Sequence, residues 1–188
     1  MSKTLKCISP IDGSIYAERP VLSVVDAASV VARAKDAQSA WASRPLQERV
    51  DLVMAGVAAV GAMNDEIVPE LAWQMGRPIA YGASEIKGFE DRARYMISIA
   101  GDALAPVRPT PIEGFDRYIK RDPLGVVFTI AAWNYPYLIA VNSVIPALMA
   151  GNTVVLKPAE YTSLTALLFA QICQEAGLPK GVVNIVTG

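Results

Sequence analysis

The feature that most constrains the fold is a long uncharged segment, residues 124–156. After residue 123 the only charged residues are Lys157, Glu160, Glu175 and Lys180. The chain is 53% hydrophobic, with a mean hydropathy of +0.32, which indicates a large core. It therefore divides into an amphipathic front part and a deeply apolar back part.

The back part alternates strand and helix signals. Residues 125–131, 153–156 and 182–186 are apolar and β-rich, whereas residues 137–150 and 163–176 have helical patterns. Strand starts roughly 30 residues apart have the size of βαβ units, and near-continuous apolar strands are typical of a parallel sheet covered on both faces. We predict an α/β fold class, with N-terminal helices packed on an open parallel Rossmann-like sheet. No helix follows the third strand, so we expect an N-terminal piece of a longer protein, with the catalytic domain beyond residue 188.

A membrane span is the alternative for residues 124–156, because about 20 apolar residues suffice to cross a bilayer. Asn134, Asn142, Pro146 and Gly151 lie within this segment. Hydrocarbon would penalise the unpaired amides, whereas a buried βαβ unit would not. We therefore expect no membrane contact.

The front part, residues 1–105, has apolar residues at helical spacing and is predicted to be the helical part of a cofactor-binding domain. Ser23 with Asp26 forms a capping-box pattern at the first helix. The predicted helices run from Ser23 to about Trp41, from Leu46 to Val60, from Ile67 to Met75 before Gly76, and from Ile86 to a stop at Gly101.

Residues 106–123 link the two parts and are predicted to form a β-hairpin excursion. Prolines bound the segment, Gly114 marks a turn, and residues 117–121 alternate between basic and apolar. This pattern suits an edge strand that pairs with another chain, or equally an ordinary solvated hairpin.

Composition excludes several classes of function. The net charge of −1 and pI of about 5.5 argue against a nucleic-acid partner. The absence of histidine excludes histidine-dependent catalysis and the usual zinc sites, so no metal is predicted. Cys7 and Cys173 form no disulfide framework and no signal core follows Met1, which together predict a cytoplasmic location.

Several motifs give the chain a resemblance, over essentially its whole length, to the NAD(P)-dependent aldehyde dehydrogenase superfamily. They occur in the family's order and spacing, which makes the match specific. The motifs are Gly76-Arg77-Pro78, Trp133-Asn134-Tyr135-Pro136, the run GNTVVLKPAE at residues 151–160, and Ala176-Gly177-Leu178-Pro179 with the following residues 181–188.

The resemblance implies oxidation of an aldehyde to a carboxylic acid, with NAD(P)+ accepting hydride from a cysteine thiohemiacetal. It makes Asn134 the oxyanion-hole donor, a role worth roughly 3–4 kcal/mol. The alternative is a helix N-cap, since Asn is common there. The catalytic cysteine and glutamate have no match: Cys173 has core spacing and Cys7 precedes the recognisable fold. We expect both catalytic residues outside this chain, which alone should be inactive.

The cofactor residues follow the first two strands of the predicted sheet. Lys157 and Glu160 lie where nucleotide-binding sheets read the ribose, and a carboxylate there favours NAD over NADP. By resemblance Lys157 contacts the adenosine ribose; it would also tolerate a phosphate, so NADP stays the alternative. By resemblance too, Thr129, Ile130, Ala131 and Trp133 line the nicotinamide side, although they are equally suited to sheet core.

Two other functions stay open. One is an acylating or phosphate-releasing reductase of the same fold, against which Asn134 and Glu160 argue. The other is a non-catalytic domain that binds only a nucleotide or a partner. The resemblance further implies a homodimer or homotetramer, formed in the full-length protein through residues 106–123.

Overall fold

The computed structural model describes residues 3–188. At its centre is a parallel sheet of three strands in the order β3-β4-β5, formed by Val126–Ile130, Thr153–Lys157 and Val183–Ile185. The middle strand pairs with β3 along its full length, from Val126 opposite Thr153 to Ile130 opposite Lys157. The predicted parallel sheet is confirmed.

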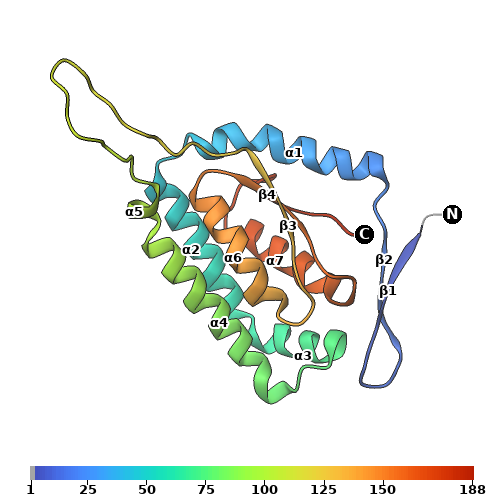
Figure 1. Cartoon of the computed structure of the whole chain (residues 1–188). Helices are drawn as coiled ribbons and strands as arrows, with labels where there is room; N and C mark the ends of the chain where they lie inside the picture. Colours follow the sequence, from blue (N-terminus) through green and yellow to red (C-terminus); the bar gives the residue numbers. More distant parts are fainter. Residues whose placement is uncertain (1–2) are drawn as a thin grey trace.

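Helices cover both faces of this sheet (Figure 1). Helix α1 (Val24–Ala42) packs on one face, while α6 (Pro136–Met149) and α7 (Ser163–Glu175) pack on the other. The side chains of β4 alternate accordingly: Val154 and Leu156 join the main core, whereas Val155 joins a small core under α1. A strand buried on both sides explains why the sequence there is apolar without interruption.

The uncharged segment is thus divided into β3, α6 and β4. Within residues 3–188, no single helix is long and apolar enough to cross a membrane. Taken together, the helices α2 (Leu46–Ala62) and α3 (Asn64–Met75) have the length and composition of a span, but the chain bends by 69° between them.

The other predicted helices are present. The Ser23 hydroxyl accepts from the Asp26 N–H at 3.1 Å, which confirms the predicted cap of α1. Gly76 ends α3 with a φ of 76°, as a left-handed glycine stop should. The stop predicted at Gly101 is wrong. Helix α4 (Ile79–Ser98) ends earlier, and Gly101, without a positive φ, lies inside the short helix α5 (Ala100–Leu104).

Sequence reasoning missed an N-terminal hairpin. Strands β1 (Thr4–Ile8) and β2 (Ile15–Pro20) pair antiparallel before α1 begins. Gly13 supplies a φ of 77° in the connecting turn, and the Asp12 carboxylate accepts from the Ser14 N–H at 2.9 Å. The Asp-Gly pair between two β-rich runs was the available signal.

The predicted excursion, residues 106–123, projects from the body as an extended loop between α5 and β3 (Figure 1). It forms a hairpin in outline only: two isolated antiparallel bridges join Val107 to Ile119 and Ile112 to Phe115. Its residues from 106 to 122 are all exposed.

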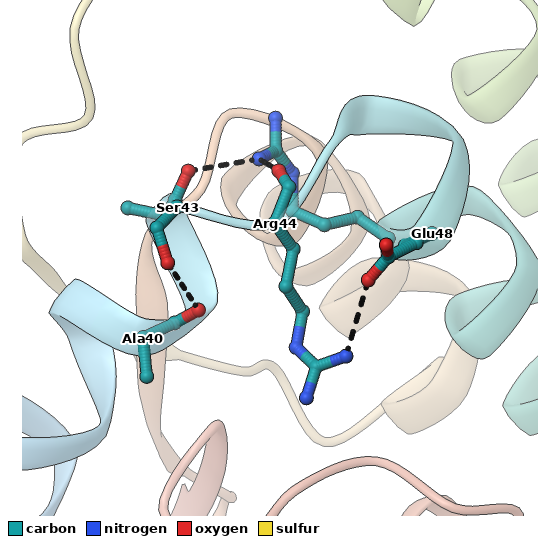
Figure 2. Close-up of polar contacts among 6 residues, drawn as sticks. Ala40, Ser43, Arg44 and Glu48 are labelled. Atoms are coloured by element: carbon teal, nitrogen blue, oxygen red, sulfur yellow. Dashed lines mark hydrogen bonds and ion pairs between the residues drawn. The ribbon is translucent and has the colours of Figure 1, made fainter.

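A buried arginine fixes the corner between α1 and α2. On the outside of the corner, Ser43 donates to the Ala40 carbonyl and Arg44 pairs with Glu48 (Figure 2). Arg49, only 8% exposed, donates instead to the carbonyls of Ala42 (3.2 Å), Arg44 (2.6 Å) and Met149 (3.2 Å). One guanidinium therefore joins the corner to the C-terminal end of α6.

Candidate functional site

The Asn134 motif follows β3 and the Glu160 motif follows β4, and these neighbouring strands end at paired residues. Ile130 and Lys157 are partners across β3 and β4, and the Ala131 N–H donates to the Lys157 carbonyl at 2.9 Å. The turn that contains Asn134 and the turn that ends at Glu160 therefore start side by side. They lie beyond the carboxyl ends of parallel strands, where ligands of such sheets bind.

Asn134 is exposed and does not cap the helix that follows it. The N-cap of α6 is Tyr135, whose side chain makes no capping hydrogen bond. In the part of the chain that the structure describes, the Asn134 side-chain amide donates no hydrogen bond, while its backbone carbonyl accepts one from Arg77. The amide N–H groups of Asn134 are therefore available to a ligand.

A buried ion pair supports this turn from behind. Arg77 Nε lies 3.1 Å from Glu85 Oε2, and the two side chains are 9% and 0% exposed. These two atoms form no hydrogen bond, because their alignment does not meet hydrogen-bond geometry. The contact is therefore an electrostatic ion pair. The Arg77 guanidinium also lies 4.2 Å from the centroid of the Tyr135 ring, and Glu85 Oε1 accepts from the Tyr137 N–H at 3.0 Å.

Glu85 is thus the capping carboxylate of α6, supplied by α4. Burial raises the pKa of Glu85, and the hydrogen bond from the Tyr137 N–H and the charge of Arg77 oppose that rise. Sequence reasoning missed this residue. The signal was a carboxylate four residues before Phe89, on the apolar face of α4.

The end of β4 carries a second charged pair. Lys157 Nζ lies 2.8 Å from Glu160 Oε1, and the Glu160 side chain is 55% exposed. The hydrogen bond from Lys157 lowers the pKa of Glu160, so this carboxylate is ionised at neutral pH. Each group balances the charge of the other at the carboxyl end of β4.

The four residues predicted to line the nicotinamide side divide into two kinds. Thr129 and Ala131 are buried, and the Ser143 hydroxyl donates to Thr129 Oγ1 at 3.2 Å. Ile130 and Trp133 are 68% and 55% exposed, so only these two present side chains to a ligand.

Trp133 borders a surface groove that reaches the residue after Glu160. The groove is lined by Ile8, Pro10, Gln74, Met75, Trp133 and Tyr161. Most of this lining is apolar, and an apolar wall of this kind suits a nucleotide base.

Neither cysteine is placed to act as a nucleophile. Cys7 and Cys173 are 1% and 4% exposed and form no disulfide. Burial raises the pKa of both thiols, that of Cys173 to about 12, and Cys7 Sγ donates to the Tyr161 carbonyl at 3.0 Å. A thiol held protonated in the core attacks no substrate at neutral pH.

Comparison with known proteins gives one consistent family. The Aldehyde dehydrogenase family model matches residues 1–188. A peroxisomal aminoaldehyde dehydrogenase 1 from Malus domestica is 35% identical over 197 residues, which cover 100% of this chain and 39% of that protein. The chain therefore spans about two fifths of the length of this curated relative.

Solved structures agree. An NADP-dependent glyceraldehyde-3-phosphate dehydrogenase from Bacillus halodurans, complexed with NADP, matches at 30% identity with a TM-score of 0.90. The match covers 99% of this chain and 40% of that one. An NAD-dependent benzaldehyde dehydrogenase from Corynebacterium glutamicum matches at 31% identity with a TM-score of 0.91, covering 99% and 41%.

Proposed function

Because the chain belongs to the aldehyde dehydrogenase family, we propose that it supplies the cofactor-binding part of an enzyme that oxidises an aldehyde to a carboxylic acid with NAD(P)+. The observation that carries the proposal is the exposed, uncommitted amide of Asn134 beside the charged end of β4. Structural relatives described as NAD-dependent and as NADP-dependent support both cofactors as candidates.

Asn134 acts as the oxyanion donor in this proposal. When a nucleophile adds to the aldehyde carbon, negative charge develops on the carbonyl oxygen, and a fixed amide N–H stabilises that charge without being deprotonated. A nicotinamide cofactor, when bound, would supply the hydride acceptor. Asn134 is suited to its task because its turn is anchored through the backbone while its side chain stays unpaired.

Lys157 and Glu160 read the adenosine ribose of the bound cofactor. The Glu160 carboxylate accepts hydrogen bonds from ribose hydroxyls and repels a 2′-phosphate, which favours NAD. Trp133 and Ile130 provide exposed apolar surface at the mouth of the site, whereas Thr129 and Ala131 contribute through packing behind it.

The nucleophile belongs to sequence that this chain does not contain. Its two cysteines are buried and protonated, and its curated relative is more than twice as long. We expect the purified 188-residue chain to reduce no NAD with any aldehyde. The unpaired thiols also support a reducing, cytoplasmic location.

The test is Asn134→Ala in the complete enzyme. Loss of one oxyanion donor should lower kcat about 10²–10³-fold with little change in the Kd for NAD. Asn142→Ala is the matched control, because Asn142 is also exposed and its amide donates only to the Leu138 carbonyl of its own helix. An unchanged kcat for Asn134→Ala would leave a site that binds nucleotide but uses this amide for no chemistry.

We also propose that the excursion at residues 106–123 mediates self-association into a dimer or tetramer. It exposes Phe115 (71%), Tyr118 (52%) and Ile119 (65%), large apolar side chains that contact with another copy would bury. Deletion of residues 111–121 from the complete enzyme should lower the mass measured by light scattering. A deletion variant with the parent's oligomeric state would contradict this proposal.

A further inference from the structure

We propose that Arg77 and Glu85 are positioning residues that hold Asn134 in its reactive place; this inference rests on the function proposed above. The Glu85 side chain is fully buried and that of Arg77 is 9% exposed. Arg77 contacts the turn that carries Asn134, where it binds the carbonyl of Asn134, and Glu85 contacts the start of the following helix. Their contacts follow the Asn134 side chain directly in the chain.

Arg77 holds the turn itself. It lies between the left-handed Gly76 that ends α3 and Pro78 at the start of α4, so the backbone on both sides is restricted. Its guanidinium donates to the Asn134 carbonyl and lies over the Tyr135 ring. A guanidinium that bonds to the Asn134 carbonyl and lies against the Tyr135 ring restrains the turn at two points.

Glu85 holds the start of α6. Its Oε1 accepts from the Tyr137 N–H, one of the N-terminal N–H groups that the helix leaves unpaired. Tyr135 provides no side-chain cap, so α4 supplies what the local sequence lacks. Because the other carboxylate oxygen faces Arg77 Nε at 3.1 Å, the turn and the helix start are tied to one pair.

The consequence is geometric. Asn134 is exposed, and a solvent-facing amide would otherwise sample several rotamers and backbone positions. Oxyanion stabilisation needs the donor close to its final place before the reaction begins, and a misplacement of about 1 Å can reduce the rate about 10²-fold. The buried pair fixes the backbone from which the amide projects.

The test uses Arg77→Met, which keeps a long apolar side chain but removes the charge and the donors. In the complete enzyme we expect a 10-fold to 100-fold lower kcat, with the KM for NAD changed less than about twofold. Arg77→Lys should restore most of the activity, since its ammonium can still pair with Glu85. Asp91→Asn is the control, because it removes a charge pair with Lys87 on the exposed face of α4, the helix that carries Glu85.

A double-mutant cycle with Asn134→Ala distinguishes positioning from general support. If Arg77 acts through Asn134, Arg77→Met should cause no further loss of kcat in the Asn134→Ala background. Equal losses in both backgrounds would overturn the proposal.

Hydrogen exchange provides a readout that does not depend on catalysis. The backbone amides of Asn134, Tyr135, Tyr137 and Leu138 should exchange faster in Arg77→Met and at the normal rate in Asp91→Asn. Unchanged exchange would overturn the proposal. If exchange is faster in Arg77→Met but Asn134→Ala has the parent's kcat, Arg77 and Glu85 do hold the turn. The oxyanion role proposed for Asn134 would then be the part that is wrong.

Discussion

Helix α6 is held at both ends by buried charged side chains, but the two ends differ in what those side chains contact. At the C-terminal end, Arg49 donates to the Met149 carbonyl and Trp41 Nε1 donates to the Leu148 carbonyl at 3.1 Å. At the N-terminal end, Glu85 accepts from Tyr137 and recruits Arg77. A cation at the C-terminus and a carboxylate at the N-terminus both match the helix dipole.

The difference lies in where the remaining hydrogen bonds go. Arg49 uses its other donors on the carbonyls of Ala42 and Arg44, so every partner belongs to the scaffold. Arg77 directs a donor to the exposed turn of Asn134. The C-terminal end therefore contributes stability, and the N-terminal end transmits that rigidity to a turn whose side chain is left unpaired.

The largest expected effect is on stability at the C-terminal end. Arg49→Ala leaves three carbonyls without their donor in a buried corner, and we expect a loss of about 3 kcal/mol or more in the free energy of unfolding. Urea denaturation measures it. Arg44→Ala, which removes an exposed pair with Glu48, should cost less than about 1 kcal/mol. Equal losses in the two variants would contradict the assigned role of Arg49.

An intermediate effect is expected beside the N-terminal end, at the end of β4. Glu160→Ser removes the carboxylate that neutralises Lys157 and frees the ammonium group to meet a 2′-phosphate. The ratio of kcat/KM for NADP to that for NAD should rise about 10-fold, or ~1.4 kcal/mol. Glu175→Gln, at the far end of α7, is the control. A constant ratio would mean that Glu160 does not read the ribose.

The smallest expected effect concerns pH and separates the two ends directly. Since the folded-state pKa of Glu85 is raised above 4.5, its contribution to stability is complete below pH 4.5 and is lost as pH rises through the raised value. The Glu85→Gln variant should therefore become more stable relative to the parent as pH rises. Its kcat should be lower than that of the parent. Urea midpoints measured between pH 4.5 and 8 test this.

Arg49 provides the comparison for that series, because a guanidinium stays protonated over the whole range. Arg49→Ala should thus be less stable than the parent by the same amount at each pH. A parallel pH response in Glu85→Gln and the parent would show that burial of Glu85 has no net effect on its ionisation.

Periodic segments of the sequence predicted most of the fold. Strand β4 and helix α6 were predicted because residues 124–156 are uncharged and largely apolar, as a mostly buried βαβ unit requires. The hairpin of β1 and β2 was missed because both strands are short, mostly exposed and without a continuous apolar run. Gly101 misled because a helical glycine and a glycine stop look alike in sequence.

The candidate site was predictable only in part. Asn134, Lys157 and Glu160 follow strands, and strand ends can be read from sequence. The contact of Glu85 with Tyr137 could not be predicted from the sequence. It joins residues more than 50 positions apart and depends on how α4 packs along α6. That contact is a property of tertiary packing, which the periodicity of apolar residues within one segment does not predict.

The exposed excursion has a practical consequence, because protease cleavage within it can be used to follow self-association. Trypsin cleaves after lysine and arginine except before proline, so Arg108-Pro109 should resist while Arg117, Lys120 and Arg121 are open to attack. If copies of the enzyme cover this loop, nicking will slow as protein concentration rises, and the midpoint of that slowing will give the association constant without any label.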